Sequence, residues 1–373
     1  MIYLDYAAET PVNQQVLDVF CQVSTEYIAN PNSTHKLGRK SLDRLNQSTS
    51  AIATMLGVKD NEIIYTSGAS ESNNLALKGI AGIYKKYGKH IITTYLEHSS
   101  VTGAITALQQ EGYDVDYVDI LDNGLVDLDH LKELLRDDTI LVSIGYVDSE
   151  IGICQDIQSI GILLKEYPHC YFHVDGTQAI GKIPVTLENI DLFTFTAHKF
   201  YGINGCGVLI KKDNVMLQPQ IHGGISSTPY RSGTPMLAHI VATEKAMELA
   251  METMVEHVSY VTRLNKRLRE KMREYKDIRI NSTDKAVPFI LNISMKGMNT
   301  QAFQKALEEE QVYVSTKSAC CAPNTPSRPV YAITKDRKSA LSTLRISLSY
   351  LTTEDELEEF LRIFHECYKQ QQK

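Results

Sequence analysis

Two charged side chains in the sequence, Lys199 and Asp175, each follow an apolar run that predicts a buried strand. A buried lysine has a lowered pKa and can form a Schiff base with a carbonyl group. An aspartate that ends a buried strand is costly unless water or a cation, such as a protonated pyridine nitrogen, pairs with it. One strand–helix–strand unit separates the two residues, so both can reach one pocket. Together they predict a pyridoxal-phosphate site, although either residue alone also suits a turn or a helix cap.

The segment Thr-Ser-Gly-Ala-Ser-Glu-Ser-Asn at 66–73 directly follows another apolar run and could hold an anion. A glycine and small hydroxyl residues at the start of a helix let backbone N–H groups approach a phosphate, and the helix N-terminus favours negative charge. The segment contains neither the P-loop motif G-x-x-x-x-G-K-[ST] nor the dinucleotide-binding motif G-x-G-x-x-G. A plain helix N-cap with a capping glutamate is the other interpretation.

Two adjacent cysteines, Cys320 and Cys321, precede a segment, 322–338, that holds three prolines and several small polar residues. This composition predicts a mobile loop. A thiolate at its start could attack a substrate that the rest of the chain holds. Incidental loop cysteines are the alternative.

Composition excludes several classes of function. The 373 residues are 43% hydrophobic and 22% charged, as in an ordinary globular protein. The net charge of −7, without a long run of Lys or Arg, argues against direct binding to nucleic acid. No stretch has the length of a signal peptide or a membrane span, so we expect a cytoplasmic protein with no membrane association. The seven cysteines contain no C-x-x-C pair, which predicts no metal site and no disulfide framework.

Short β-rich runs alternate with helical patterns over the first two-thirds of the chain, which predicts an α/β fold with a mostly parallel sheet. Several runs are apolar throughout, as in strands that are buried on both faces. The predicted strands are Ile63–Thr66, His90–Thr94, Val115–Val118, Ile140–Val147, Cys170–Val174, Leu192–Thr196 and Gly207–Lys211. The predicted helices between them are Ser70–Tyr87, Ser99–Glu111, Leu128–Arg136 and Ile157–Glu166.

From about Pro235 the pattern changes to a long helix, Pro235–Met272 with a break, and then to a small α+β unit. Its predicted strands are Ile278–Ile280, Val287–Ile293, Val312–Ser315 and Thr343–Ser347, and its predicted helices are Thr300–Glu309 and Glu354–Gln370. We therefore expect a large domain over 13–255 and a small domain formed by 1–12 and 256–373.

The chain resembles the cysteine desulfurases of the NifS/IscS type, which belong to the class-V aminotransferase-type pyridoxal-phosphate enzymes. The motifs above occur in the same order as in that family. The resemblance implies fold type I, which is aspartate-aminotransferase-like, with a seven-stranded sheet in the large domain. The region of Cys320 resembles the long-loop class. The segments that carry the resemblance are Tyr3–Ala8, Asn30–Ser33, Thr66–Asn74, Thr94–His98, Asp138–Gly152, His173–Gln178, Thr196–Gly202, His222–Gly224, Arg231–Thr234 and Ser318–Cys320.

The resemblance implies a role for each matching residue. Lys199 would form the Schiff base with pyridoxal 5′-phosphate, His98 would stack on its ring and transfer protons, and Cys320 would take the sulfur of L-cysteine as a persulfide. Arg345 would bind the substrate carboxylate, and Asn32 would also contact the substrate. Further cofactor contacts would come from Ala69, Ser70, Ser149, Asp175, Gln178, Thr196 and His198, and from Thr234 of a partner subunit. This last contact implies a homodimer with composite sites.

The sequence departs from the family pattern in several places, one of which is Ser70, where threonine is common. Asp148 and Ser149 stand where two asparagines are usual, and a carboxylate near the substrate carboxylate is unfavourable unless it points away. Cys321, directly after Cys320, is unusual and would be a bystander or a second persulfide carrier. The sulfur acceptor is expected to be an iron–sulfur scaffold or a protein of tRNA or thiamine thiolation, and the altered asparagine pair favours thiolation slightly.

Three other functions remain open at this point. Selenocysteine lyases use the same framework, and other fold-type I enzymes, such as aminotransferases, share the cofactor residues but not the Ser-Ala-Cys segment. A poorly active relative that works as a binding partner is the third.

Overall fold

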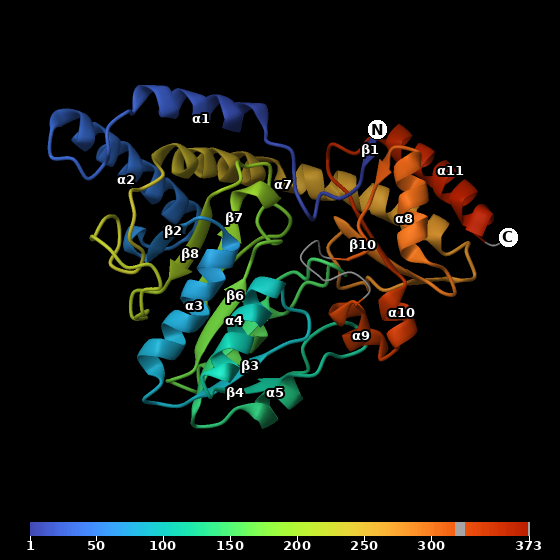
Figure 1. Ribbon diagram of the computed structural model, residues 1–373, viewed down its shortest axis with the longest axis horizontal. Helices are drawn as coiled ribbons and strands as arrows, with labels where there is room; N and C mark the ends of the chain where they lie inside the picture. Colours follow the sequence, from blue (N-terminus) through green and yellow to red (C-terminus); the bar gives the residue numbers. More distant parts are fainter. Residues whose placement is uncertain (318–324, 372–373) are drawn as a thin grey trace.

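The computed structural model describes residues 1–317 and 325–371, so Cys320 and Cys321 lie outside the described residues. Figure 1 shows a large lobe built on a seven-stranded sheet and a smaller lobe that contains both ends of the described chain. The α/β class and the mostly parallel seven-stranded sheet that the sequence predicts are confirmed. No helix in these two ranges has the length and apolarity needed to cross a bilayer.

The large sheet has the order β2-β8-β7-β6-β5-β3-β4. Only β8 runs antiparallel to its neighbours; the other pairs are parallel. All seven predicted strands are present with ends shifted by at most a few residues: β2 (Ile63–Thr66), β3 (His90–Thr93), β4 (Asp114–Tyr117), β5 (Thr139–Gly145), β6 (Tyr171–Asp175), β7 (Leu192–Thr196) and β8 (Gly207–Lys211).

Hydrophobic cores lie on both faces of this sheet, because successive side chains of a strand point to opposite faces. In β2, Ile64 packs into a core with α3 (Ala69–Tyr84) and α4 (Ser99–Gln110), whereas Ile63 packs into the larger core on the other face. That second face is covered by helices that include α6 (Ile157–Leu164). Burial on both faces explains why the strand sequences are apolar throughout rather than alternating.

Two N-terminal helices were not predicted from the sequence: α1 (Gln14–Glu26) and α2 (Lys36–Leu56). Both pack against the long helix α7 (Leu237–Met272), as Figure 1 shows. The predicted break in that long helix is wrong: α7 is continuous over 36 residues. Its sequence contains neither glycine nor proline, so no residue interrupts the backbone hydrogen bonds of α7 along its length. The short helix α5 (Leu128–Leu134) completes the large lobe.

The small lobe is built around β10 (Ile290–Met295), which pairs antiparallel with β9 (Ile278–Ile280) and β12 (Thr343–Ser347). The N-terminal strand β1 (Ile2–Tyr3) pairs with β11 (Val312–Tyr313) in this lobe. The helices α8 (Thr300–Glu309) and α11 (Glu354–Gln371) pack against each other. The α+β character predicted for this region is therefore confirmed.

The predicted loop 322–338 is wrong over its second half, which contains α9 (Arg328–Thr334) and the start of α10 (Arg337–Leu341). The Ser327 side chain caps α9 by accepting from Val330 N, and Asp336 caps α10 in the same way. Proline in the first turn of α9 is compatible with a helix, because no intrahelical partner is needed for its nitrogen there. Residues 322–324 of the predicted loop lie outside the described ranges.

Candidate active site

A cavity of about 420 Å³ opens where β5, β6 and β7 end, at the carboxyl edge of their parallel strands. This edge is where open α/β sheets bind ligands. The N-termini of α3 and α4 point into the same region, and Arg345 reaches it from β12 of the small lobe. Ten residues predicted for the site line this cavity: Ala69, Ser70, His98, Ser149, Asp175, Gln178, Thr196, His198, Lys199 and Arg345.

Lys199 ends a single 3-10 turn, Ala197–Lys199, that directly follows β7. Its ammonium group donates to the backbone carbonyl of Ala7, with 3.1 Å between Nζ and O, and to that of Ala8. The N-terminal segment therefore holds the amine at the mouth of the cavity. The sequence did not predict that Lys199 donates to these two carbonyl groups.

Asp175 is held as an oriented hydrogen-bond acceptor at the end of β6. Its Oδ1 accepts from Thr177 N at 3.0 Å, and its Oδ2 accepts from Asn73 Nδ2 at 2.8 Å. The same Asn73 amide nitrogen lies 2.9 Å from Ser100 Oγ, which in turn contacts His98 Nδ1 at 2.9 Å. A continuous polar chain therefore joins Asp175 to His98, and Asn73 and Ser100 are two members that sequence reasoning missed.

His98 is neutral, with its proton on a defined nitrogen. It is the N-cap of α4, and its Nδ1 accepts from the backbone N–H of Ser100 at 3.2 Å. Because Nδ1 accepts, the proton of the neutral ring is on Nε2. Burial lowers the pKa of His98, which keeps the imidazole uncharged near neutral pH. A neutral imidazole can take up a proton and return it.

His198 and Thr196 form a second fixed pair on the cavity wall. The Thr196 hydroxyl donates to the Cys206 carbonyl at 2.8 Å, so its oxygen accepts from His198 Nδ1 at 3.1 Å. Burial, with Lys199 and Lys182 nearby, lowers the pKa of His198 to about 4. His198 is therefore a neutral hydrogen-bonding group in this state.

The start of α3 makes the contact expected of a capping glutamate and also lines the cavity. Glu71 accepts from Ser67 N at 2.8 Å, as a capping glutamate does, and its other oxygen pairs with Arg231 at 2.9 Å. Ala69 and Ser70 nevertheless line the cavity with the helix N-terminus behind them. Close packing of Gly68 against Gly207 permits this arrangement, because a Cβ on Gly207 would lie 2.3 Å from the Gly68 carbonyl carbon.

Arg345 is 1% exposed and is positioned by two fixed acceptors. Its Nη1 donates to the Ser149 carbonyl at 2.9 Å, and its Nη2 pairs with Asp5 Oδ1 at 2.7 Å. The Nε of Arg345 has no partner among the described residues. The guanidinium therefore keeps donor capacity that an anion in the cavity could use.

Asp148, the departure that cast doubt on substrate binding, is turned toward the backbone. Its Oδ1 accepts from the N–H groups of Glu150 and Ile151. Burial, with a contribution from Glu150, raises the pKa of Asp148 to about 7. The side chain is therefore largely uncharged below that pH, which reduces the expected conflict with a substrate carboxylate.

Glu97 is a buried cavity residue that sequence reasoning did not single out. Its Oε1 accepts from Thr94 Oγ1 at 2.9 Å and from Gly145 N at 3.0 Å, while its Oε2 has no partner among the described residues. Burial raises the pKa of Glu97 to about 8, and the carboxylates of Asp175 and Asp148 act in the same direction. The sequence feature that could have identified Glu97 is its position beside His98, shortly after a predicted strand.

Two described residues that were predicted for the site, Thr234 and Asn32, do not line this cavity. Thr234 lines a surface hollow that also contains Asn30 and Pro31, and Asn32 Nδ2 donates to Ser226 Oγ at 2.8 Å. Cys320 lies outside the described residues. The roles of all three stay predictions.

The cavity fits pyridoxal phosphate by the chemistry of its walls. It offers an amine, an oriented carboxylate and a helix N-terminus within one space. Several buried polar atoms in its wall lack a protein partner among the described residues: Glu97 Oε2, Asp148 Oδ2, Thr177 Oγ1 and Arg345 Nε. Buried polar groups are normally paired, so these atoms are suited to a polar ligand.

Comparison with known proteins agrees with this chemistry. The family model described as aminotransferase class-V matches residues 2–360. A protein named cysteine desulfurase IscS from Neisseria meningitidis is 37% identical over 364 residues, covering 96% of this chain and 89% of its own. One with the same name from an Enterobacter species is 38% identical over 371 residues, covering 97% of this chain and 91% of its own.

Solved structures give the same result. A NifS-like protein superposes with a TM-score of 0.92 at 32% identity and covers 99% of both chains. A structure titled SspA in complex with cysteine superposes with a TM-score of 0.83 at 32% identity, covering 95% of this chain and 100% of its own.

Proposed function

Because this chain belongs to the cysteine desulfurase family of pyridoxal-phosphate-dependent, class-V aminotransferase-type enzymes, we propose that it converts L-cysteine to L-alanine and loads the sulfur onto Cys320. The observation that carries this proposal is that Lys199, Asp175 and Arg345 line one cavity. An amine, a pyridinium partner and a carboxylate-binding guanidinium are the groups that such a reaction on an amino acid requires.

The residues of the cavity can be assigned to the parts of the cofactor. Lys199 would be its covalent anchor, and Asp175 would keep its pyridine nitrogen protonated. Gln178 would face the ring hydroxyl, and His98 would stack on the ring. When bound, pyridoxal phosphate supplies an electron sink that weakens the bonds around the α-carbon of the substrate. The phosphate would be held by Ala69, Ser70, Thr196 and His198.

The substrate carboxylate would bind Arg345. Asp5 and the Ser149 carbonyl hold the two terminal nitrogens of the guanidinium, so its plane is fixed before the substrate arrives. A carboxylate oxygen could then accept from the unpaired Nε and share a terminal nitrogen. His98, neutral and with Nε2 protonated, would donate that proton to the substrate carbon.

The sulfur step balances without an external oxidant. The Cys320 thiolate attacks the sulfur of the bound L-cysteine, an S–S bond forms, and the C–S bond of the substrate breaks. The substrate carbon takes up a proton and leaves as L-alanine, while Cys320 retains the extra sulfur as a persulfide anion. The persulfide then passes to an acceptor protein.

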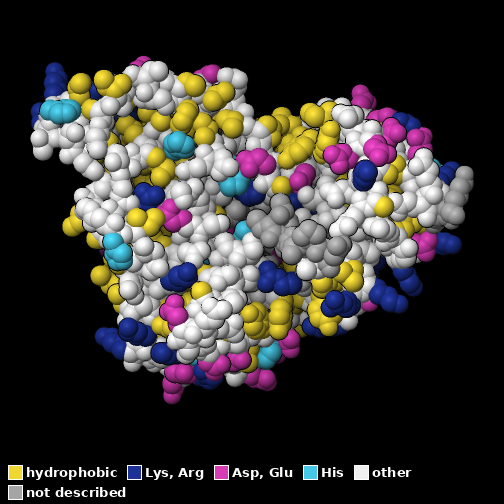
Figure 2. All heavy atoms as spheres, viewed as in Figure 1, with side chains coloured by type: hydrophobic (Ala, Val, Ile, Leu, Met, Phe, Trp, Pro, Cys, Tyr) yellow, Lys and Arg dark blue, Asp and Glu magenta, His cyan; other side chains and the backbone are white. Residues whose placement is uncertain are grey.

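A homodimer would complete the site, with Thr234 of the partner subunit contacting the phosphate. Thr234 and Asn32 both lie outside the cavity of their own chain, which supports a role across an interface. Large apolar side chains are exposed in this region: Ile28 is 79% exposed and Ile225 is 83% exposed. Figure 2 shows further apolar side chains across the face formed by α1 and α7.

The acceptor would be an iron–sulfur scaffold or a thiolation enzyme. Since backbone amides hold Asp148 Oδ1, the departure at position 148 gives no reason to prefer either class. Persulfide transfer from the loaded protein to a scaffold and to a thiolation protein distinguishes them.

The test is an assay of the purified protein with L-cysteine and a reductant. We expect a visible absorption band from the bound cofactor, and alanine and sulfide in equal amounts. Cys320→Ala should retain the band and lose sulfide production, whereas the matched variant Cys321→Ala should keep both if Cys321 is a bystander. A coloured protein that releases selenide from selenocysteine but no sulfide from cysteine would overturn the proposal in favour of a selenocysteine lyase.

A further inference from the structure

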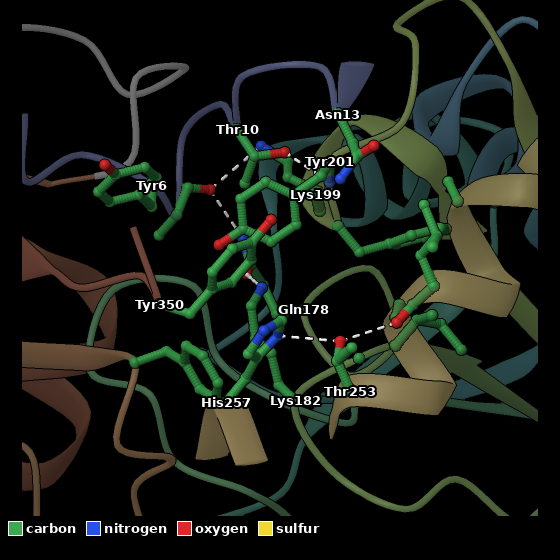
Figure 3. Close-up of a pocket in the computed structure, with 18 of the residues that line it drawn as sticks. Tyr6, Thr10, Asn13, Gln178, Lys182, Lys199, Tyr201, Thr253, His257 and Tyr350 are labelled. Carbon is green, nitrogen blue, oxygen red and sulfur yellow. Dashed lines mark hydrogen bonds between the residues drawn. The ribbon is translucent and has the colours of Figure 1, made fainter. Parts of the chain in front are cut away.

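A second cavity of about 230 Å³ has Gln178 in its wall (Figure 3). The N-terminal segment, the middle of α7 and the residues after β12 enclose it. Gln178 and Lys199 line both cavities. Most of its wall is apolar, with side chains that include Val16, Ala246, Leu249, Ala250, Phe289 and Leu348.

A second lysine, Lys182, lines this cavity besides Lys199, and it is buried. Lys182 is only 9% exposed, and the hydrogen bond that its Nζ makes is to Gln178 Oε1 at 2.6 Å. An ammonium group has three donors, so a neutral amide oxygen leaves it incompletely paired. The residues that line the cavity include no aspartate or glutamate. Burial, with Lys199 and Arg345 nearby, lowers the pKa of Lys182 to about 7, as expected of a buried cation without a counter-ion.

Another part of the wall is aromatic. The His257 ring stacks on Tyr350 with 3.8 Å between ring centroids and 7° between planes. Thr253 donates its hydroxyl proton to the Leu249 carbonyl, so its oxygen accepts from His257 Nδ1 at 3.1 Å. This wall is therefore shaped before any ligand binds, and it offers a flat aromatic surface rather than a charge.

We propose that this cavity binds a small amphipathic carboxylate, with the carboxylate on Lys182 and a short apolar body against α7 and Phe289. A buried ammonium without a counter-ion selects an anion, and the apolar walls exclude strongly hydrated ions such as inorganic phosphate. This site is separate from the amino acid site at Arg345 and does not depend on the proposed reaction. Because Gln178 lines both cavities, a ligand that competes for Lys182 would release Gln178 Oε1 beside the cofactor site.

Isothermal titration calorimetry on the protein as isolated tests this site with 4-methylpentanoate as the probe. The neutral 4-methylpentanamide, which has the same shape, is the matched control. We expect the acid to bind and the amide to bind about ten- to a hundredfold more weakly, the effect of losing a charge-assisted hydrogen bond. Equal binding of the two compounds, or no binding of the acid, would overturn the proposal.

Three variants locate the binding. Lys182→Met, which keeps the length of the side chain, should lose acid binding by the same factor. Ala250→Leu, which fills the cavity and leaves Lys182 in place, should also lose it, and it serves if Lys182→Met does not fold. Arg345→Lys should retain it. Loss in Arg345→Lys with retention in both other variants would assign the probe to the larger cavity and overturn the proposal.

Discussion

Asn73 Nδ2 donates a hydrogen bond of 2.8 Å to Asp175 Oδ2, so a helix residue fixes the carboxylate at the end of the neighbouring strand β6. The Asp175 side chain therefore has one oxygen held by an amide and the other by the backbone of Thr177. An acceptor held in this way does not need to reorient when a cation approaches, which is the basis of electrostatic preorganisation.

Replacing Asn73 with alanine should lower kcat/KM for L-cysteine by about tenfold, since one hydrogen bond to a charged group is lost. The visible band of the bound cofactor should shift as the protonation of its ring nitrogen becomes less complete. Lys78→Ala on the same helix is the control. An unchanged spectrum and unchanged kinetics for Asn73→Ala would refute a positioning role.

Replacing His98 with asparagine separates its two roles. Asparagine is a good N-cap, so α4 and the thermal stability should be retained, while the imidazole is lost. We expect kcat to fall by about a hundred- to ten-thousandfold, as for loss of a general acid–base group. Stopped-flow absorbance and thermal unfolding measure the two effects. An unchanged kcat in His98→Asn would show that another group transfers the proton.

Replacing Arg345 with lysine should raise KM for L-cysteine by about tenfold or more and change kcat less, because a lysine cannot pair with a carboxylate in a bidentate geometry. Asp5→Asn should produce a smaller rise, since it removes the charge of only one of the two groups that orient the guanidinium. A fall in kcat with no change in KM would place Arg345 outside the substrate site.

The buried Glu97 predicts how stability depends on pH. The folded protein keeps the Glu97 proton up to about pH 8, whereas the unfolded chain releases it near 4.5. Between these values the folded state binds more protons, so its free energy of unfolding falls as the pH rises. Glu97→Gln retains the acceptor for Gly145 N and removes the titration.

Urea unfolding at pH 5.5 and pH 8 measures this effect. The midpoint should fall less between the two pH values in Glu97→Gln than in the unchanged protein. Asp148 contributes to the fall in both proteins and so does not affect the comparison. An identical fall would show that Glu97 is ionised in the folded state.

The same reasoning gives Asp148 a kinetic signature. Its pKa of about 7 means that the carboxylate becomes charged as the pH rises above neutrality. KM for L-cysteine should therefore rise more steeply above pH 7 in the unchanged protein than in Asp148→Asn. The asparagine retains an oxygen for the N–H groups of Glu150 and Ile151. Parallel pH profiles would show that the charge at position 148 does not reach the substrate.

The sheet and the central residues of the site could be predicted because their signals are local. Apolar strands buried on both faces are visible in the sequence; Asp175 ends one such strand, and Lys199 lies just after another. The helix α9 was missed because its segment is rich in proline, a residue that reads as a loop unless its place in the first turn is known.

Other residues of the site could not be predicted because their roles depend on contacts between distant segments. Asn73 and Glu97 are polar residues near motif positions, and only the folded arrangement shows that one holds Asp175 and the other is buried without a counter-ion. Lys182 reads as a surface lysine, yet it is buried in the wall of the second cavity.

The N-terminal segment has a consequence for biosynthesis. Asp5 pairs with Arg345 across 340 positions of sequence, and Ala7 and Ala8 supply the carbonyls that hold Lys199. On the ribosome, Asp5 is made long before Arg345, so the early segment has to wait for its partner until the small lobe emerges. The catalytic centre of a nascent chain is thus completed among the last steps of folding, and the incomplete protein has no assembled site with which to begin releasing reactive sulfur.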